Sequence, residues 1–207
     1  MVNLIISAVG EPYISDTLSF LKERNTAEHN IHILTDKPKL FPEYNTTCFY
    51  RSYFNFFDKF LFGLKVIEQT KQPGFIWDAD LLSHFDTVHY KFNLEGKNPQ
   101  FAGYWLEGNT LDYFIEERKH FFNLLDTWLE KNQLTRKDIY MLQEHWSFWP
   151  YRDYSKTVDL LSHLSHLFEA NSRINGGHKN SFGNGEGAGI STALKLSGIE
   201  FDSITVD

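Results

Sequence analysis

Short apolar blocks alternate with longer amphipathic segments along this chain. The short blocks have the length and composition of buried strands, whereas the longer segments repeat their apolar residues every three or four positions, as helices do. The pattern predicts strands at residues 2–9, 30–36, 46–50, 74–80, 101–106 and 199–206, and helices at residues 15–24, 53–71, 110–130, 135–145, 155–170 and 189–197. Strands that alternate with helices favour an α/β fold, with a mixed, mainly parallel sheet flanked by helices.

Length and composition narrow the class of protein. The chain has 207 residues, which fits a single domain, 1–207, or one domain cut from a longer chain. Its one cysteine, Cys48, excludes an internal disulfide and fits a reducing compartment, so we expect a cytoplasmic location. The apolar opening at residues 2–9 lacks the basic start of a signal peptide, and no apolar run is long enough to predict a membrane span.

The charge of the chain bears on its partners. The formal net charge of −7 opposes general binding to nucleic acid or to an anionic membrane, because both need a basic surface. A small molecule or a neutral polymer is therefore the expected partner. Gly10 has no companions in a Gly-x-Gly-x-x-Gly arrangement, which argues against NAD or FAD as the ligand.

Residues 74–82, Gly-Phe-Ile-Trp-Asp-Ala-Asp-Leu-Leu, hold the most informative pattern. An apolar run precedes Asp78 and Asp80, so both carboxylates are predicted to lie at the carboxyl end of a buried strand. In open α/β sheets, ligands bind at that edge. Two hard oxygen ligands close together suit Mg²⁺ or Mn²⁺, and such an ion suits a diphosphate. The structural alternative is a pair of solvated acids in a turn after a strand.

Other polar residues complete the set of candidates. Arg51 and Lys59 come just before the Asp-x-Asp strand and could aim a cation at the same ligand, although a solvated helix surface is the expected place for Lys59 taken alone. His163 and His166 share one helix face, but no acidic or cysteine partner accompanies them, so they are predicted to be surface histidines.

The order of these features resembles the GT-A glycosyltransferases, metal-dependent enzymes that transfer a sugar from a nucleotide-sugar donor. A nucleotide-type first half, the Asp-x-Asp near residue 80, a Phe-Ala-Gly strand at 101–103 and a Gln-Glu pair at 143–144 occur in that order, and the likeness spans residues 2–199. More faintly, the chain resembles the small glycosyltransferase domains of large algal viruses and of bacterial polysaccharide clusters. The resemblance implies transfer of a hexose, most commonly from a UDP-sugar, to a glycan or glycoprotein acceptor, with Mn²⁺ or Mg²⁺ as cofactor.

The resemblance also implies roles for residues of the donor site. Asp80 would hold the metal on the diphosphate, with Asp78 acting directly or through water, and His178 would add a late ligand. The residues expected along the nucleoside and its phosphates are Ala8, Gly10, Asp36, Arg51, Lys59 and Lys179. The Gly-rich run at residues 183–189 would be a mobile cover over the phosphates; it lacks the Gly-Lys-Ser/Thr ending of a P-loop.

The acceptor side follows from the same resemblance. Glu144, with His145 beside it, would approach the transferred sugar or the acceptor, and would take the acceptor proton if the reaction inverts configuration. Residues 105–109 would line the sugar pocket. Glu144 stands where many members of the family have an Asp-bearing pair, and the sequence does not decide between inversion and retention.

Two other functions compete with this interpretation. Phosphohydrolases of the haloacid dehalogenase type also use Asp-x-Asp after an apolar strand, but they usually place it on the first core strand, whereas at least two strands and two helices precede the Asp-x-Asp strand in this chain. A noncatalytic carbohydrate-binding module is favoured by the aromatic content of 16% and by the polar loops. Such a module has no need of a nucleotide-type first half.

Overall fold

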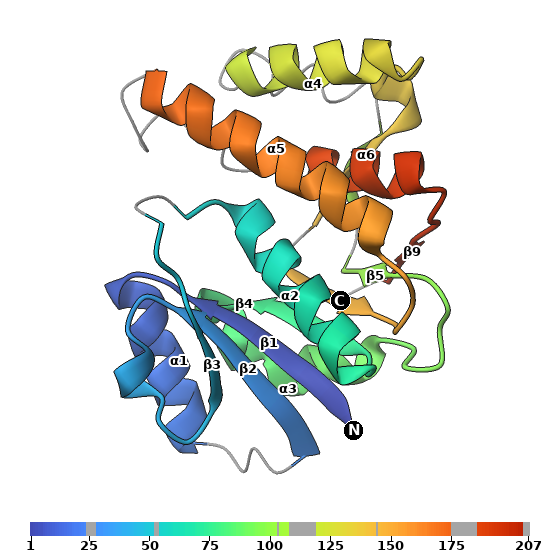
Figure 1. Cartoon of the computed structure of the whole chain (residues 1–207). Coiled ribbons are helices and arrows are strands. Elements are labelled where there is room, and N and C mark those ends of the chain that lie inside the picture. The colour runs from blue at the N-terminus through green and yellow to red at the C-terminus, as the bar shows by residue number, and fades with distance from the viewer. Residues whose placement is uncertain are drawn as a thin grey trace.

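The computed structural model describes residues 1–23, 28–51, 54–102, 104–107, 119–143, 145–174 and 186–204. Strands and helices alternate along these ranges, as the hydrophobic pattern predicts (Figure 1). The strands are β1 (Val2–Ala8), β2 (His29–Thr35), β3 (Asn45–Cys48), β4 (Gly74–Asp78), β5 (Gln100–Phe101), β6 (Tyr104–Glu107), β7 (Tyr140–Leu142), β8 (Trp146–Trp149) and β9 (Asp202–Ser203). The helices are α1 (Glu11–Glu23), α2 (Phe56–Thr70), α3 (Phe85–Val88), α4 (Lys119–Lys131), α5 (Ser155–Ile174) and α6 (Glu186–Ser197).

Seven strands form one sheet in the order β3-β2-β1-β4-β8-β5-β9. Strands β3, β2, β1 and β4 run parallel to one another, β8 is antiparallel to both β4 and β5, and β9 is parallel to β5. The prediction of an α/β fold with a mixed, mainly parallel sheet is therefore confirmed. Strands β6 and β7 pair separately as a two-stranded antiparallel sheet.

The sheet separates two hydrophobic layers. Alternate residues of a strand point to opposite faces, so Leu4 and Ile6 pack with α1 and α3, whereas Ile5 packs with α2. Helices α5 and α6 extend the α2 layer, and α4 lies beyond α5 (Figure 1). None of the helices in the described part of the chain is long and apolar enough to cross a membrane.

The predicted short helix at residues 135–145 is wrong. Thr135 and Asp138 do form the expected capping box, with the Thr135 N–H donating to Asp138 Oδ2 at 2.7 Å, but only one 3-10 turn follows. The chain is then extended as β7, because Tyr140–Leu142 pairs with β6 on one side and packs against α6 on the other. Long-range contacts thus override the local helix signal.

Two further predictions need correction. The strand expected at residues 101–106 is split, since Phe101 pairs in the main sheet and Tyr104 pairs in the small one. The Gly-rich run expected as a mobile cover enters α6 at residue 186, and Gly187 and Gly189 are buried there. Residues 183–185 lie outside the described ranges. The two buried glycines let α6 approach its neighbours closely, so they serve packing.

Gly187→Ala should show how closely α6 approaches β7. A Cβ at residue 187 would lie 2.2 Å from the Leu142 carbonyl oxygen and 2.8 Å from the Leu142 nitrogen, which are backbone atoms that no rotamer change can move. Overpacking typically costs about 1–3 kcal/mol, against a helix-propensity gain of about 1 kcal/mol. Because these are backbone contacts, we expect a net loss of roughly 2 kcal/mol and a melting temperature lower by roughly 4–8 °C. Lys195→Ala, an exposed change on the same helix, is the control, and equal melting temperatures would contradict the close approach.

Candidate functional site

The candidate site lies where three parallel strands end. Ser7 of β1 is in register with Asp78 of β4, and Ala8 is in register with Thr35 of β2, so these strands end at one edge of the sheet. Strand β8 runs the opposite way and therefore begins there. The Asp78 N–H donates to the His145 carbonyl at 2.8 Å, which extends the β4–β8 pairing by one residue. The fold thus brings residues 8–11, 36, 78–80 and 145 to one edge.

Asp78 is buried and has partners on both carboxylate oxygens. Lys59 Nζ lies 2.5 Å from Oδ1, and His145 Nδ1 lies 2.9 Å from Oδ2. Burial alone would raise the pKa of Asp78, but the Lys59 ammonium and the hydrogen bonds from His145 and Lys59 outweigh it, so the pKa lies below its ordinary value of 3.8. Asp78 is therefore an ionised, fully engaged carboxylate at neutral pH.

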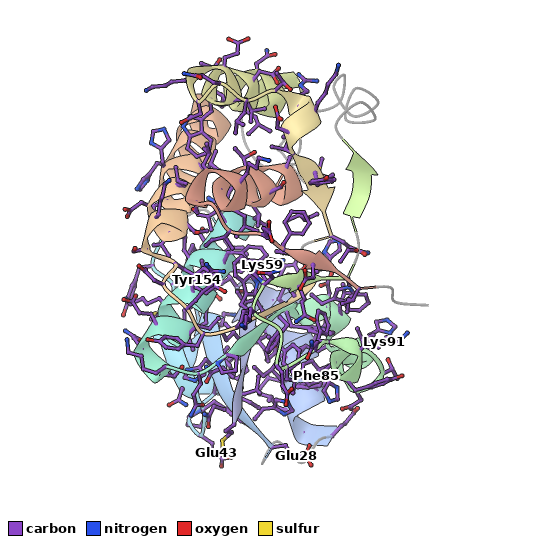
Figure 2. The ribbon with its side chains drawn as sticks, turned by 90° about the vertical axis from the view of Figure 1, so that its right-hand side faces the viewer. Glu28, Glu43, Lys59, Phe85, Lys91 and Tyr154 are labelled. Atoms are coloured by element: carbon purple, nitrogen blue, oxygen red, sulfur yellow. The ribbon has the colours of Figure 1, made fainter. Side chains whose placement is uncertain are left out.

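The expectation of a solvated Lys59 is wrong. Its side chain is 1% exposed and lies in the interior, where Figure 2 labels it. Because α2 carries Lys59 on the side of the helix that also buries Asn55 and Gly63, four residues away in each direction, the stem is packed and only the ammonium reaches a polar group. That helical spacing was the signal available in the sequence.

Asp80 differs from Asp78 in every respect that matters for a ligand. It is exposed, two residues further along, in the 3-10 turn Ala79–His84. The Trp77 indole N–H donates to the Leu81 carbonyl at 3.0 Å and fastens this turn to the strand. Partial burial and the nearby Asp78 charge raise the pKa of Asp80 above 3.8. A cation beside Asp80 would relieve that repulsion.

A hollow of about 390 Å³ opens beside Asp80, between α1 and the turn that follows β4. Four acidic side chains line it, which are Asp16, Glu23, Asp80 and Asp86. Ser19 and Ser83 add hydroxyl groups to the wall. The space next to the exposed carboxylate is therefore open to a ligand and negative in charge.

The loop after β1 and the end of β2 are tied together. The Gly10 N–H donates to Asp36 Oδ1 at 3.2 Å, and Gly10 has a φ of +92°, a backbone conformation that favours glycine. Lys37 and Glu11 form an ion pair across the same gap. Ala8 is fully buried at the strand end, backbone included, and its predicted place along the nucleoside stays a prediction.

Arg51 is anchored at the start of α2, near the same edge. It forms an ion pair with the buried Asp58, whose carboxylate also accepts the Asn55 N–H at 3.0 Å and the Ser165 hydroxyl at 3.3 Å. The guanidinium also lies 5.5 Å from the centre of the Phe49 ring. Arg51 is thus held in place, and its predicted role toward a phosphate stays a prediction.

Several predicted site residues lie outside the described ranges. They are Glu144, His178, Lys179 and residues 108–109 of the expected sugar pocket. His163 is described, is exposed as predicted, and stacks on Trp128 of α4 with ring centres 5.7 Å apart.

Tyr13 belongs to the site although the sequence pattern did not single it out. It lies in the first turn of α1, and its pKa is raised by partial burial and by the charges of Asp80, Asp78 and Asp16. The Tyr13 hydroxyl therefore lies within electrostatic range of both carboxylates of the Asp-x-Asp. The signal for Tyr13 in the sequence is an aromatic residue directly after Gly10-Glu11-Pro12, in the first turn of α1.

No family model and no curated protein matches this sequence.

The side chains at this edge fit a metal ion that needs only one carboxylate from the protein. Asp78 does not fit as a direct ligand, because each of its oxygens already contacts a nitrogen. Asp80 does fit, since it is an exposed carboxylate. In the described ranges no three His, Cys, Asp or Glu side chains gather as a metal centre. Mg²⁺ commonly takes one or two carboxylates and fills its other positions with substrate phosphates and water. The edge therefore suits a cation that arrives with a diphosphate.

Proposed function

We propose that this protein is a metal-dependent glycosyltransferase that moves a hexose from a nucleotide-sugar donor, a UDP-sugar by preference, to a glycan or glycoprotein acceptor. The observation that carries the proposal is the difference between the two acids of the Asp-x-Asp. Asp78 is buried and contacts Lys59 and His145, whereas Asp80 is exposed. Ligands bind at the carboxyl ends of parallel strands in α/β sheets, and this pair lies there.

Binding of the donor follows from the positions of the side chains. Asp80 would hold Mn²⁺ or Mg²⁺ on the diphosphate. A divalent cation neutralises the negative charge that develops on a diphosphate leaving group as the sugar–phosphate bond breaks. Tyr13, partly exposed in the first turn of α1, would offer a ring on which a nucleobase can stack, and the Asp36 carboxylate, which accepts the Gly10 N–H, would accept a hydrogen bond from the nucleoside.

Lys59 and Asp78 act as positioning residues in this proposal. The ammonium and the carboxylate neutralise each other in a buried place and hold the end of β4, and with it the turn that carries Asp80. Preorganised groups of this kind need no rearrangement when the charge of the leaving group develops.

His145 is the described side chain best placed to accept a proton from the acceptor. Asp78 Oδ2 contacts Nδ1, and when the hydrogen between them belongs to Nδ1, Nε2 is the basic nitrogen of the neutral imidazole. A carboxylate that orients an imidazole is a recurring arrangement for general bases. If the reaction inverts configuration, His145 or its neighbour Glu144 would take the acceptor proton.

The two competing functions fit this arrangement less well. A phosphohydrolase of the haloacid dehalogenase type needs the first Asp as nucleophile, yet Asp78 is buried with both oxygens engaged. A noncatalytic carbohydrate-binding module needs neither an exposed metal ligand at a strand end nor the buried Lys59–Asp78 pair. The specific observations therefore favour transfer from a nucleotide sugar.

A panel of nucleotide sugars tests the proposal directly. The full chain is incubated with UDP-, GDP- and dTDP-sugars in Mn²⁺, in Mg²⁺ and in EDTA, and release of nucleotide is measured. We expect slow hydrolysis of at least one UDP-sugar even without an acceptor, and its loss in EDTA. Phosphate release from simple phosphomonoesters, with no nucleotide released from any sugar donor, would point to the phosphohydrolase instead.

A further inference from the structure

A second hollow, of about 370 Å³, lies away from the Asp-x-Asp edge. It is bounded by the start of β7, the end of α6 and the segment that leads into β9. The side chains that matter for its chemistry are Asp138, Tyr140, Ser191, Lys195, Glu200 and Phe201. Its volume falls within the range of small-ligand sites, roughly 300–1,000 Å³.

Long-range contacts hold the walls of this hollow in place. The Ser191 hydroxyl accepts the Tyr140 N–H at 2.9 Å, which joins α6 to β7. Phe201 packs edge-on against Phe101, with ring centres 5.9 Å apart at 90°, and β9 fixes the following residues to β5. The Thr135 N–H and hydroxyl both donate to Asp138 Oδ2, and these two hydrogen bonds fix the orientation of the carboxylate.

The geometry of the two aromatic rings suits a sugar ring better than a flat nucleobase. Tyr140 and Phe201 meet edge to face, with ring centres 5.5 Å apart and an interplanar angle of 81°. Two rings at this angle cannot sandwich a flat nucleobase between parallel faces, so the corner would give a base one stacking face at most. A pyranose ring is a thicker object that has apolar C–H faces, and it can sit in a corner made of one ring face and one ring edge.

The charges around the hollow further limit the class of ligand that it can bind. Asp138 and Glu200 supply two carboxylates against the single ammonium of Lys195, so a phosphate or another anion that arrives without a metal ion would be repelled. A purely aliphatic ligand is also disfavoured, because it would bury the charged groups of the rim without offering them hydrogen bonds. Carboxylates accept hydrogen bonds from neighbouring hydroxyls, and an ammonium donates to a hydroxyl or ring oxygen. A neutral sugar fits both the apolar corner and the polar rim.

We propose that this hollow is a carbohydrate subsite that holds a neutral hexose unit of the acceptor glycan. That this hexose belongs to an acceptor rests on the proposed function, whereas the binding of a sugar in the hollow does not depend on it. Tyr140 begins the strand β7, which leads through Gln143 to His145, so one short segment joins the subsite to the candidate site. Fully extended, the five steps from Tyr140 to His145 span no more than about 17 Å. A glycan could therefore occupy the subsite while its end approaches the Asp-x-Asp edge.

Oligosaccharide binding to the full chain tests the subsite. The probes are neutral di- to tetrasaccharides of glucose, galactose and mannose, and calorimetry and chemical-shift changes report binding. Two variants remove different partners: Phe201→Ala takes away one ring of the apolar corner, and Glu200→Gln removes an exposed carboxylate. We expect at least one probe to bind at millimolar concentration or tighter, about tenfold weaker in Phe201→Ala and about threefold weaker in Glu200→Gln.

Controls separate this proposal from the rest of the protein. Glu68→Gln, an exposed change on α2, should bind the same probe as the wild type does. A melting temperature for each variant shows whether it is folded, and Glu200→Gln keeps the test valid if Phe201→Ala is unstable. Wild-type affinity in both folded variants, or no binding of any probe to the wild type, would overturn the subsite. Binding that the variants weaken, in a chain that hydrolyses no nucleotide sugar, would keep the subsite and overturn the proposed transferase.

Discussion

Asp80→Asn should abolish metal-dependent binding of UDP while leaving the fold intact. The change keeps the size of the side chain but removes the negative charge of the exposed carboxylate that we assign to the metal. Because Asp78 is occupied by Lys59 and His145, it cannot replace Asp80 without breaking a buried ion pair. We expect the affinity for UDP in the presence of Mn²⁺ to fall at least about 100-fold, or about 2.8 kcal/mol.

Calorimetry with UDP, in Mn²⁺ and in EDTA, measures this effect. The matched control is Asp16→Asn, which removes an exposed carboxylate from the wall of the same hollow without touching the Asp-x-Asp. If the loss in Asp80→Asn came only from the general negative potential of the hollow, the two variants would behave alike. Strong UDP binding to the wild type in EDTA, unchanged in Asp80→Asn, would refute the role of Asp80.

Lys59→Met should destabilise the fold strongly, although it replaces a charged side chain with an apolar one. Methionine has nearly the length of the lysine stem, so little packing is lost. The Asp78 carboxylate, however, would remain buried without its main counter-charge. Removing one partner of a buried ion pair typically costs about 3–5 kcal/mol. For a chain of this size we expect a melting temperature lower by roughly 6–20 °C.

A double variant distinguishes this cause from a simple loss of packing. Lys59→Met with Asp78→Asn removes both charges, so it should recover a large part of the stability lost in Lys59→Met. Lys65→Met changes an exposed lysine on the same helix and should alter the free energy of unfolding by less than about 0.5 kcal/mol. If the double variant were as unstable as the sum of the two single ones, the Lys59–Asp78 contact would carry no coupling energy.

The pH dependence supplies an independent check on the same pair. In the wild type the pKa of Asp78 in the folded state lies below 3.8, so this carboxylate stabilises the fold at neutral pH and loses that contribution as the pH falls below 3.8. In Lys59→Met, burial would dominate and raise the pKa of Asp78 above its unfolded value, which destabilises the fold at neutral pH. Protonation relieves that cost. The stability difference from the wild type should therefore shrink from about pH 7 to about pH 4, as urea unfolding at each pH would show.

Much of the fold follows from local patterns in the sequence. The apolar run before Asp78 predicts a buried strand that ends in an acidic pair, and the structure has that strand at residues 74–78. The strand at residues 2–8 and the helix that contains residues 56–70 are likewise where the hydrophobic pattern places them, within a few residues. These elements are predictable because their apolar spacing is long and regular, and no competing contact opposes it.

The errors arise where distant residues decide the conformation. The segment 139–142 has an apolar run that could have continued a helix, but it became β7 because β6 and α6 hold it on both sides. Gly187 and Gly189 look like a flexible loop in the sequence, yet they are the close contacts of α6 with Leu142 and with Phe57. Local propensity has no access to such partners, which are separated from these residues by tens to more than a hundred positions.

The sequence by itself determined the class of the fold, the strand that delivers Asp78 and Asp80, and the chemistry that two carboxylates in that place suggest. The tertiary structure alone decided how the two acids differ. Lys59 and His145 are 19 and 67 residues away from Asp78, and only the packing of α2 and the reversed direction of β8 bring them to its two oxygens. The physical reason is that a buried ionised carboxylate is stable only when opposite charges and hydrogen-bond donors contact it. The exposed carboxylate of Asp80 is solvated by water and stays open to a ligand.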